Sequence, residues 1–154
     1  VESELYCNIR DYKPDIIVQI RPTSPFRSPD LVDAAVEMLL KDKDADSVRT
    51  VVPSGQNPFK MWRIGEKYMS PLLKVPGIAE PYNSLRQLLP DTYWQSGHLD
   101  VFRRETVLEK HSMSGEKILP LIVDRGLAID LDTEYDWNRA EWLIGHSELK
   151  FVRP

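Results

Sequence analysis

The sequence predicts a three-layer α/β fold, with helices on both faces of a largely parallel sheet. Runs of mostly β-branched residues at 15–20 and 47–52 have the pattern of strands, and the stretch between them has apolar residues at helical spacing. This strand–helix–strand order implies a right-handed crossover and parallel pairing of the two strands. A chain of 154 residues, with 42% hydrophobic and 29% charged residues, suits one such domain.

The first elements are delimited by prolines. A helical pattern at 1–11 ends before Pro14, because proline disfavours continuation of a helix. The apolar run at 15–20 suits a strand covered on both faces, as in a parallel sheet. Ser28 and Pro29 predict a helix start, with serine as the cap and proline in the first helical position. The expected buried stripe of this helix consists of Leu31, Ala34, Ala35, Met38 and Leu39.

The segment 56–95 interrupts this pattern. It is rich in proline, contains short β-like pieces such as 61–64, and has no long amphipathic helix. We interpret it as an arm inserted into a single domain that extends over 1–154. Its large apolar side chains lack a core of their own, which predicts that the arm joins two copies of the chain in a homodimer. These side chains are Phe59, Met61, Trp62, Leu72, Leu73, Leu88 and Leu89.

Regular structure resumes after the arm. The pattern predicts strands at 93–103, 118–123 and 128–132, and a short helix at 105–110. A final helix begins after Thr133, and Asp136 three residues later completes a capping-box arrangement. The side chains expected to pack this helix on the sheet are Trp137, Ala140 and Ile144.

Bulk properties exclude several classes of partner. A net charge of −4 argues against general nucleic-acid binding, which needs a basic surface. No apolar run approaches the roughly 20 residues that span a bilayer, so no membrane partner is expected. The single cysteine, Cys7, precludes an intrachain disulfide and indicates a reducing, cytoplasmic setting.

Asp130 and Asp132 are the first candidates for chemistry. Residues two apart in a strand point to the same face, so both carboxylates would lie together at the carboxyl end of the predicted strand. Ligands of α/β sheets usually bind at such ends, and two hard oxygen donors at this spacing suit Mg²⁺. The alternative is that Asp132 caps the following helix and Asp130 is a solvated strand end.

The other candidates are cations in loops. Arg21 and Arg27 lie in the proline-stiffened loop at 19–27, where guanidinium groups could match phosphate or carboxylate. Lys60 and Arg86 lie in the arm. Each of these could equally be a solvated surface side chain.

Two common catalytic patterns are weak or absent. His98 and Asp100 lie two apart on a predicted strand, and we interpret His98 as a structural histidine. The seven glycines are at least ten residues apart, so no phosphate-cradling loop passes through them. Either the protein does not bind nucleotides, or such a loop lies outside this chain.

Five short motifs follow one another along the chain. They are Q-I-R-P-T-S-P-F-R (19–27), S-V-R-T-V-V-P (47–53), N-P-F-K (57–60), L-R-Q-L-L-P (85–90) and A-I-D-L-D-T-E-Y-D-W (128–137). In this order they resemble the acylneuraminate cytidylyltransferases, or CMP-sialic acid synthetases, from about Pro14 to Leu143. Any one motif is weak, but five in series are specific.

The resemblance implies a Rossmann-like nucleotidyltransferase fold, incomplete in this chain, with the arm as a dimerisation element. It implies a Mg²⁺-dependent reaction in which the anomeric hydroxyl of a nonulosonic (sialic-type) acid attacks the α-phosphorus of CTP and releases pyrophosphate. By position, Arg86 is the implied catalytic residue, acting with Lys60 in the partner's active site, and Asp130 and Asp132 are the implied metal ligands. The implied substrate-binding residues are Arg21, Lys60 and Gln87.

The chain also departs from the family pattern. Sialate enzymes commonly have glutamine at the position of Arg21 and Asn-Gly where this chain has Ser96-Gly97, so the sugar is expected to be another nonulosonic acid, such as a legionaminic- or pseudaminic-type acid. The family's signature phosphate loop would precede Val1. We therefore expect an N-terminally truncated chain that is catalytically silent and binds CTP weakly.

Two other functions fit parts of the pattern. Asp130-Leu131-Asp132 could be the D-x-D metal site of a glycosyltransferase on a similar nucleotide-sugar fold. The chain could also be a folded dimerisation module without activity.

Overall fold

The structure is a computed structural model that describes residues 12–146 and 151. Its helices and mixed sheet confirm an α/β fold. The described residues form two compact units, one of residues 12–52 together with 95–146 and 151, the other of residues 53–94. The helix expected at 1–11, and Cys7 within it, lie outside the described residues.

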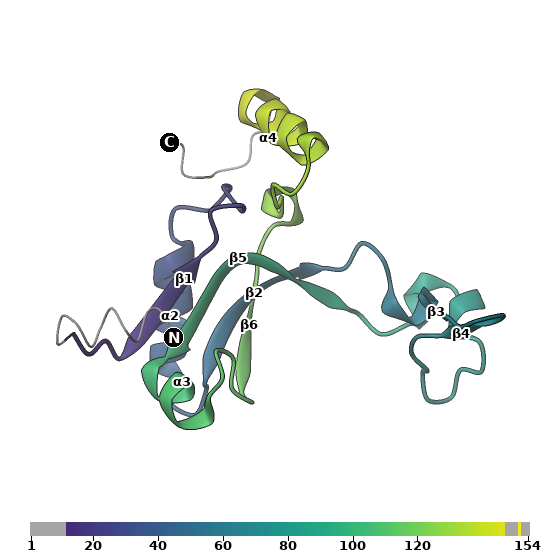
Figure 1. The fold of residues 1–154 in the computed structure, drawn as a ribbon, viewed down its shortest axis with the longest axis horizontal. Helices are drawn as coiled ribbons and strands as arrows, with labels where there is room; N and C mark the ends of the chain where they lie inside the picture. Colours follow the sequence, from purple (N-terminus) through teal and green to yellow (C-terminus); the bar gives the residue numbers. More distant parts are fainter. Residues whose placement is uncertain (1–11, 147–150, 152–154) are drawn as a thin grey trace. The chain divides into compact units, whose positions relative to one another are not determined.

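A four-stranded sheet forms the centre of the larger unit (Figure 1). Its strands are β1 (Ile16–Ile20), β2 (Ser47–Pro53), β5 (Tyr93–Arg103) and β6 (Ile118–Ile122), in the spatial order β1-β5-β2-β6. β1 pairs with β5 in antiparallel register, with Ile16 opposite Arg103 and Ile20 opposite Leu99, whereas β2 and β6 are parallel.

The expected pairing of the first two strands is wrong. The Arg103 amide donates to the Asp46 carbonyl, and Thr50 exchanges side-chain hydrogen bonds with the backbone of Leu99. These partners run in opposite order along the two strands, so β5 is antiparallel to β2 and lies between it and β1. β1 and β2 are therefore parallel but not adjacent, because a later strand of the chain occupies the place between them.

β1 is also more exposed than the sequence suggested. Val18 and Ile20 retain 37% and 47% of their accessible surface. In the described part of the chain, β1 has a neighbour only on its β5 side. The face of β1 that carries Val18 and Ile20 is therefore not covered, so the prediction of a strand covered on both faces is wrong; an apolar composition does not reveal which faces of a strand are covered.

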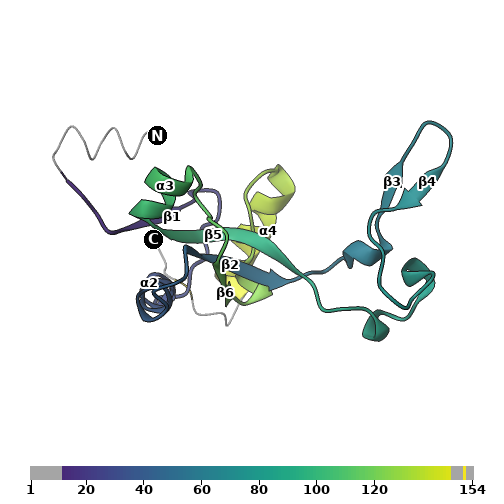
Figure 2. The same cartoon turned by 90° about the horizontal axis from the view of Figure 1, so that it is seen from below.

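α2 (Leu31–Lys41) packs on one face of the sheet, and α3 (Arg104–Lys110) lies on the other (Figure 2). Leu31, Ala35 and Leu39 of α2 are buried against strand residues that include Val48, Leu99 and Val101. The helix begins later than expected, with Asp30 as its N-cap and no side-chain capping bond. Ser28 instead uses its carbonyl to accept from the Leu31 amide in the preceding turn.

The C-terminal region differs from expectation in two ways. Residues 128–132 form no strand; Ile129 is buried, Asp130 and Leu131 are half-buried, and Asp132 is exposed. They connect η4 (Arg125–Leu127) to α4 (Glu134–His146). Of the side chains expected to pack α4 on the sheet, Ala140 is buried in a separate cluster with Phe26, Leu127 and Ile129, while Trp137 and Ile144 remain exposed.

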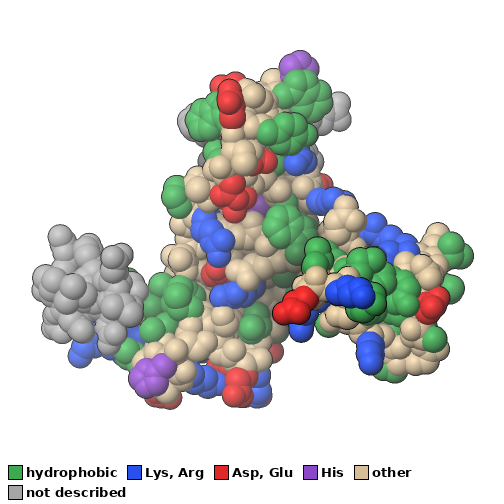
Figure 3. Space-filling view, turned by 45° about the vertical axis from the view of Figure 1, so that its right-hand side comes forward, with side chains coloured by type: hydrophobic (Ala, Val, Ile, Leu, Met, Phe, Trp, Pro, Cys, Tyr) green, Lys and Arg blue, Asp and Glu red, His purple; other side chains and the backbone are tan. Residues whose placement is uncertain are grey.

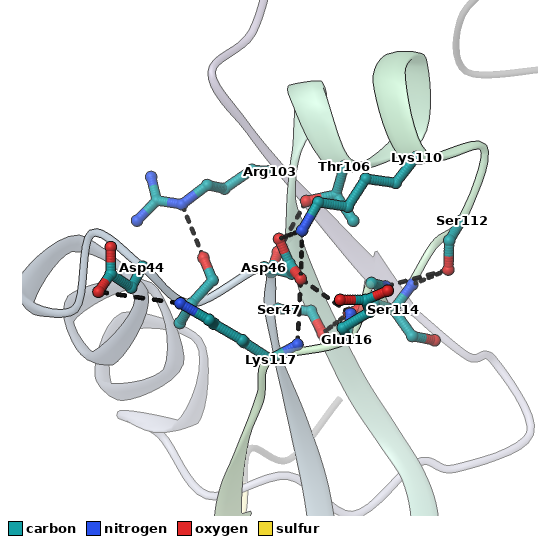
Figure 4. Close-up of polar contacts among 12 residues, drawn as sticks. Asp44, Asp46, Ser47, Arg103, Thr106, Lys110, Ser112, Ser114, Glu116 and Lys117 are labelled. Atoms are coloured by element: carbon teal, nitrogen blue, oxygen red, sulfur yellow. Dashed lines mark hydrogen bonds and ion pairs between the residues drawn. The ribbon is translucent and has the colours of Figure 1, made fainter.

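A buried carboxylate ties together the ends of β2, α3 and β6 (Figure 4). Asp46 accepts hydrogen bonds from the Lys110 ammonium at 2.7 and 2.9 Å, and from the amides of Glu116 at 2.8 Å and Lys117 at 3.0 Å. The bond from Lys110, followed by the backbone bond from Lys117, lowers the pKa of Asp46 to about 2. Gly115, at φ +66°, leaves the space that the Asp46 side chain occupies.

The unit at 53–94 is built from short elements. They are η1 (Pro58–Lys60), β3 (Trp62–Ile64), β4 (Met69–Pro71), η2 (Pro81–Asn83) and η3 (Arg86–Leu88), with β3 and β4 in an antiparallel hairpin. Hydrophobic side chains gather on its surface (Figure 3), and Ile64, Tyr68, Leu85 and Leu88 are each at least 65% exposed. Its role as a dimerisation arm stays a prediction.

Candidate functional site

Arg21 lies in a turn directly after β1, and its backbone carbonyl accepts two hydrogen bonds. Its carbonyl accepts hydrogen bonds from the Ser24 amide, at 3.3 Å, and from the Arg27 guanidinium. Arg27 also donates through Nε to the His98 carbonyl of β5, at 3.3 Å. Burial lowers the pKa of Arg27. Arg27 thus binds the backbone just after β1 and in the middle of β5, whereas Arg21 presents its side chain to solvent.

Gly97 provides the surface on which the Arg21 side chain rests. It has φ +73°, a left-handed conformation that favours glycine. A Cβ at this position would lie 3.1 Å from Nη1 of Arg21 and 3.4 Å from its Cδ. The glycine therefore has two roles: it allows the left-handed backbone conformation in β5, and it leaves room for the Arg21 guanidinium.

The aspartate segment meets the Arg21 turn through the backbone. The Leu131 amide, between Asp130 and Asp132, donates to the Thr23 carbonyl at 2.8 Å. Two motifs more than 100 positions apart in sequence are thereby brought into contact. The candidate site in the larger unit thus combines an arginine, two carboxylates and the turn that joins them.

The two carboxylates differ in environment. The Oδ1 atom of Asp130 is buried and has no hydrogen-bond partner among the described residues, while Asp132 is exposed. A buried carboxylate oxygen without a donor is costly unless a cation or ligand completes it. One or two carboxylates, with further ligands from phosphate and water, suit Mg²⁺. The described residues contain no cluster of three or more His, Cys, Asp and Glu side chains that could hold a metal by themselves.

The helix cap after Asp132 is made by other residues. The Thr133 amide and hydroxyl both donate to Asp136 Oδ2, at 3.0 and 2.6 Å, and the Asp136 amide donates back to the Thr133 hydroxyl at 3.3 Å. This is the reciprocal capping box that the sequence predicted. Since Asp136 does the capping, the capping explanation for Asp132 has no support in the described contacts.

Ser24 and His98 are buried neighbours of the site that sequence reasoning did not assign to it. His98 is 1% exposed and bonds through Nε2 to the Leu127 carbonyl at 2.6 Å, which agrees with a structural histidine. Its Nδ1 and the Ser24 hydroxyl have no partner among the described residues. The P-T-S-P motif placed Ser24 in the loop, but only the three-dimensional structure shows its burial.

A polar network on the sheet face was also missed. Arg49 of β2 lies 3.6 Å from Asp100 of β5, and its Nη1 donates to Gln95 at 2.7 Å. Gln19 of β1 is opposite Asp100. Asp100 therefore interacts with Arg49 rather than with His98, and it forms part of a row of polar side chains across three strands.

The remaining sequence-predicted site residues lie in the unit at 53–94. Lys60 donates to the carbonyls of Tyr82 and Ser84, at 3.3 and 2.6 Å. Arg86 donates to the carbonyls of Ser54 and Gly55, at 2.7 and 3.3 Å. Gln87 is exposed. Arg86 also lines a cavity of about 280 Å³ together with Pro53, Asn57, Leu89, Asp91 and Tyr93.

Two curated proteins show similarity to the chain. It is 26% identical over 137 residues to post-translational flagellin modification protein B of Campylobacter coli, a match that covers 88% of this chain and 55% of the relative. It is 30% identical over 101 residues to CMP-N,N'-diacetyllegionaminic acid synthase of Campylobacter jejuni, which covers 65% of this chain and 40% of that protein. The chain thus spans about half the length of the curated relatives it matches. No family model matches the chain.

These matches agree with the resemblance of the motifs at the level of a broad class. The chain is related, at low identity, to a protein named for the synthesis of a CMP-linked sugar acid. The described residues contain no helix that is long and apolar enough to cross a membrane.

Proposed function

We propose that the protein containing this chain is a cytidylyltransferase of the sialic-acid-activating type, with a Rossmann-like nucleotidyltransferase fold. Its substrates are CTP and a nonulosonic acid of the legionaminic type. The observation that carries the proposal is the hydrogen bond between Leu131 and Thr23, because it joins the Arg21 turn to the aspartate pair. The similarity to a CMP-N,N'-diacetyllegionaminic acid synthase supports the same substrate class.

The reaction breaks a phosphoanhydride bond of CTP and forms a phosphodiester bond to the sugar. The anomeric oxygen of the sugar acid forms a bond to the α-phosphorus of CTP, and the bond from that phosphorus to the bridging oxygen of the β-phosphate breaks. Pyrophosphate leaves with the bonding electrons, and the hydroxyl proton passes to solvent or a nearby base. Such transfers depend mainly on alignment and charge stabilisation.

Asp130 and Asp132 are the proposed magnesium ligands. The unpartnered Oδ1 of Asp130 and the exposed carboxylate of Asp132 supply two hard oxygen donors. Magnesium, when bound, would supply positive charge for the phosphate oxygens. The Leu131 amide, next to Asp130, is bound to the Thr23 carbonyl, and Asp132 makes no bond in the helix cap, so we propose that both carboxylates are free to bind a ligand.

We propose that the segment 53–94 contributes three substrate-contacting residues, namely Arg86, Lys60 and Gln87. Arg86 is the proposed catalytic residue, because a guanidinium can stabilise charge that develops on the phosphates. Its present bonds are to two backbone carbonyls, which hold the side chain without neutralising it. We further propose that the protein is a homodimer, in which these residues complete the site of the partner subunit.

The test is an assay of the complete gene product with CTP, Mg²⁺ and a panel of nonulosonic acids. We expect pyrophosphate release that requires a sugar acid and is lost when EDTA removes the metal. The Arg86→Ala variant should lose turnover, whereas Arg63→Ala, in the neighbouring hairpin, should retain it. If the protein instead consumes a preformed nucleotide sugar and releases no pyrophosphate, the glycosyltransferase alternative replaces this proposal.

A further inference from the structure

We propose that Ser24 and His98 are positioning residues, which hold the carboxylate of Asp130 through one shared, buried water molecule. The catalytic consequence rests on the proposed function, because Asp130 is a proposed magnesium ligand. The water site itself does not depend on that function, and the experiment below tests it separately from activity.

Buried polar atoms without a partner gather at one place in the larger unit. Among the residues that the structure describes, four buried side-chain atoms lack a hydrogen-bond partner, and three of them are Oγ of Ser24, Nδ1 of His98 and Oδ1 of Asp130. The fourth, Nε of Arg49, lies 3.6 Å from a carboxylate oxygen of Asp100. Buried polar groups are rarely left unpaired, because their lost hydration must be replaced. Three such atoms on adjoining segments therefore point to a ligand that they share.

The segments of Ser24 and Asp130 are joined directly. The Leu131 amide, one residue after Asp130, donates to the carbonyl of Thr23, one residue before Ser24, at 2.8 Å. The Ser24 side chain is 0% exposed, so its hydroxyl has no access to bulk solvent.

His98 is tied to both of these segments. Its Nε2 bonds to the carbonyl of Leu127, three residues before Asp130, at 2.6 Å. Its own carbonyl accepts from Arg27, three residues after Ser24, at 3.3 Å. His98 is 1% exposed, so bulk solvent does not reach its ring either.

The bonding capacity of the three groups matches one water molecule. A carbonyl only accepts, so Nε2 of His98 carries the hydrogen, and Nδ1 of the neutral ring is then an acceptor. The carboxylate oxygen of Asp130 also accepts, whereas the Ser24 hydroxyl can donate. A water that donates to His98 and to Asp130 and accepts from Ser24 satisfies all three groups. Three hydrogen bonds are typical of a buried water.

The water fixes the orientation of the Asp130 carboxylate. A carboxylate oxygen has two lone pairs, so Asp130 can accept from the water and still offer a lone pair to magnesium. Removal of a partner one bond behind a metal ligand typically costs about 10- to 100-fold in metal affinity or activity. His98 thus has two separable roles, since Nε2 holds the Leu127 carbonyl and Nδ1 holds the water.

The direct test is a high-resolution crystal structure of the complete gene product. We expect one ordered oxygen within about 3.2 Å of Ser24 Oγ, His98 Nδ1 and Asp130 Oδ1. NMR of the His98 imidazole should show a hydrogen on Nε2 and none on Nδ1. The absence of that oxygen, a metal ion in its place with contacts of about 2.1 Å, or a hydrogen on Nδ1 would overturn the inference.

Two variants each remove one partner of the water. His98→Gln keeps an amide nitrogen that can donate to the Leu127 carbonyl but removes the acceptor at Nδ1, and Ser24→Ala removes the hydroxyl. Ser47→Ala is the matched control, because Ser47 is also buried, at 1% exposed, but its hydroxyl donates to the Ser114 carbonyl at 2.6 Å.

In assays of pyrophosphate release, His98→Gln and Ser24→Ala should each raise the Mg²⁺ concentration for half-maximal rate about 10-fold. The KM for CTP at saturating Mg²⁺ should not change, and Ser47→Ala should change neither quantity. The double variant should match the larger single effect, because both residues act through one water.

An unchanged Mg²⁺ requirement in both variants, effects that multiply in the double variant, or an equal shift in Ser47→Ala would overturn the positioning role. The crystal structure and the NMR measurement need no turnover. A protein that holds this water but forms no CMP-sugar would therefore refute the proposed reaction and not the water site.

Discussion

Asp132 and Asp136 lie one turn apart at the start of α4, yet their contacts differ. Asp136 accepts from the Thr133 amide and hydroxyl, whereas Asp132 is exposed and uninvolved in the described cap. We expect Asp132→Asn to reduce turnover by orders of magnitude, because a charged metal ligand is lost. The melting temperature should hardly change. Steady-state kinetics and thermal unfolding of the complete gene product measure both quantities.

Asp136→Ala is the matched control. It should remove the capping box and lower the stability by about 1 kcal/mol, with normal activity per folded molecule. If Asp132→Asn instead lowers stability while its activity per folded molecule stays normal, the metal-ligand proposal is wrong and Asp132 has a structural role.

The low pKa of Asp46 predicts how the free energy of unfolding depends on pH in acid. Its folded-state pKa of about 2 lies below the ordinary 3.8. The carboxylate therefore stabilises the fold fully above about pH 4, and this contribution is lost as the pH falls from about 4 toward 2. Asp46→Asn should lower the free energy of unfolding at pH 7 by about 2 kcal/mol, as for lost charge-assisted hydrogen bonds. It should also flatten the dependence of stability on pH in this range.

Asp44→Asn provides the comparison for Asp46. Its carboxylate lies 3.9 Å from the Lys117 ammonium, and both side chains are exposed. Exposed pairs contribute little, so this variant should match the wild type within about 0.5 kcal/mol. Denaturant unfolding between pH 2 and pH 7 distinguishes the two aspartates. Equal behaviour of the two variants would contradict the role assigned to Asp46.

At the scale of elements, Gly115 lies between α3 and β6 and packs against Asp46, the residue before β2. Its left-handed backbone and the Asp46 side chain leave no room for a Cβ. Gly115→Ala should therefore destabilise the larger unit by about 2 kcal/mol or more, because backbone strain and a steric clash add. Gly77→Ala carries only the strain and should cost about 1 kcal/mol. Thermal unfolding that ranks the two in the opposite order would contradict this explanation.

The sequence predicted most strands of the sheet but not which strands pair with each other. The apolar runs at 16–20, 47–53 and 118–122 are strands, and the boundaries 93–103 are those expected. The pairing of β1 with β5 depends on contacts between residues about 80 positions apart. Local patterns carry no information about such pairings, so the order of the strands and the exposure of β1 could not be derived.

The candidate site was only partly predictable for a similar reason. The spacing of Asp130 and Asp132 was recognisable, although the strand expected there is an irregular connection. The role of Gly97 could not be recognised, because the sequence around a glycine in a strand does not show which distant side chain packs over it. The Arg49–Asp100 pair joins β2 and β5, which are separated in the sequence by the segment 53–94, so no local pattern predicts it.

At the scale of the whole molecule, the surface of the segment 53–94 predicts self-association. Leu88 is 65% exposed there, together with several other large apolar side chains. Exposed apolar surface of this kind is typical of interfaces. We expect the complete gene product to be a dimer by light scattering, and Leu88→Glu to shift it toward monomer.

Leu40→Glu is the control for this surface. Leu40 is 57% exposed on α2, in the other unit, and its replacement should leave the dimer intact. A wild-type protein that stays monomeric at high micromolar concentration would contradict the proposed arm. Dissociation caused by Leu40→Glu but not by Leu88→Glu would place the interface elsewhere.

The central claim is cytidylyl transfer to a sugar acid, and following the α-phosphorus of CTP tests it most directly. With CTP labelled at that atom, N,N'-diacetyllegionaminic acid and Mg²⁺, the complete gene product should transfer the label to the sugar. One pyrophosphate should be released for each labelled CMP-sugar, and Asp132→Asn should abolish both products. Label that never becomes linked to a sugar acid from a full panel of nonulosonic acids would contradict the account.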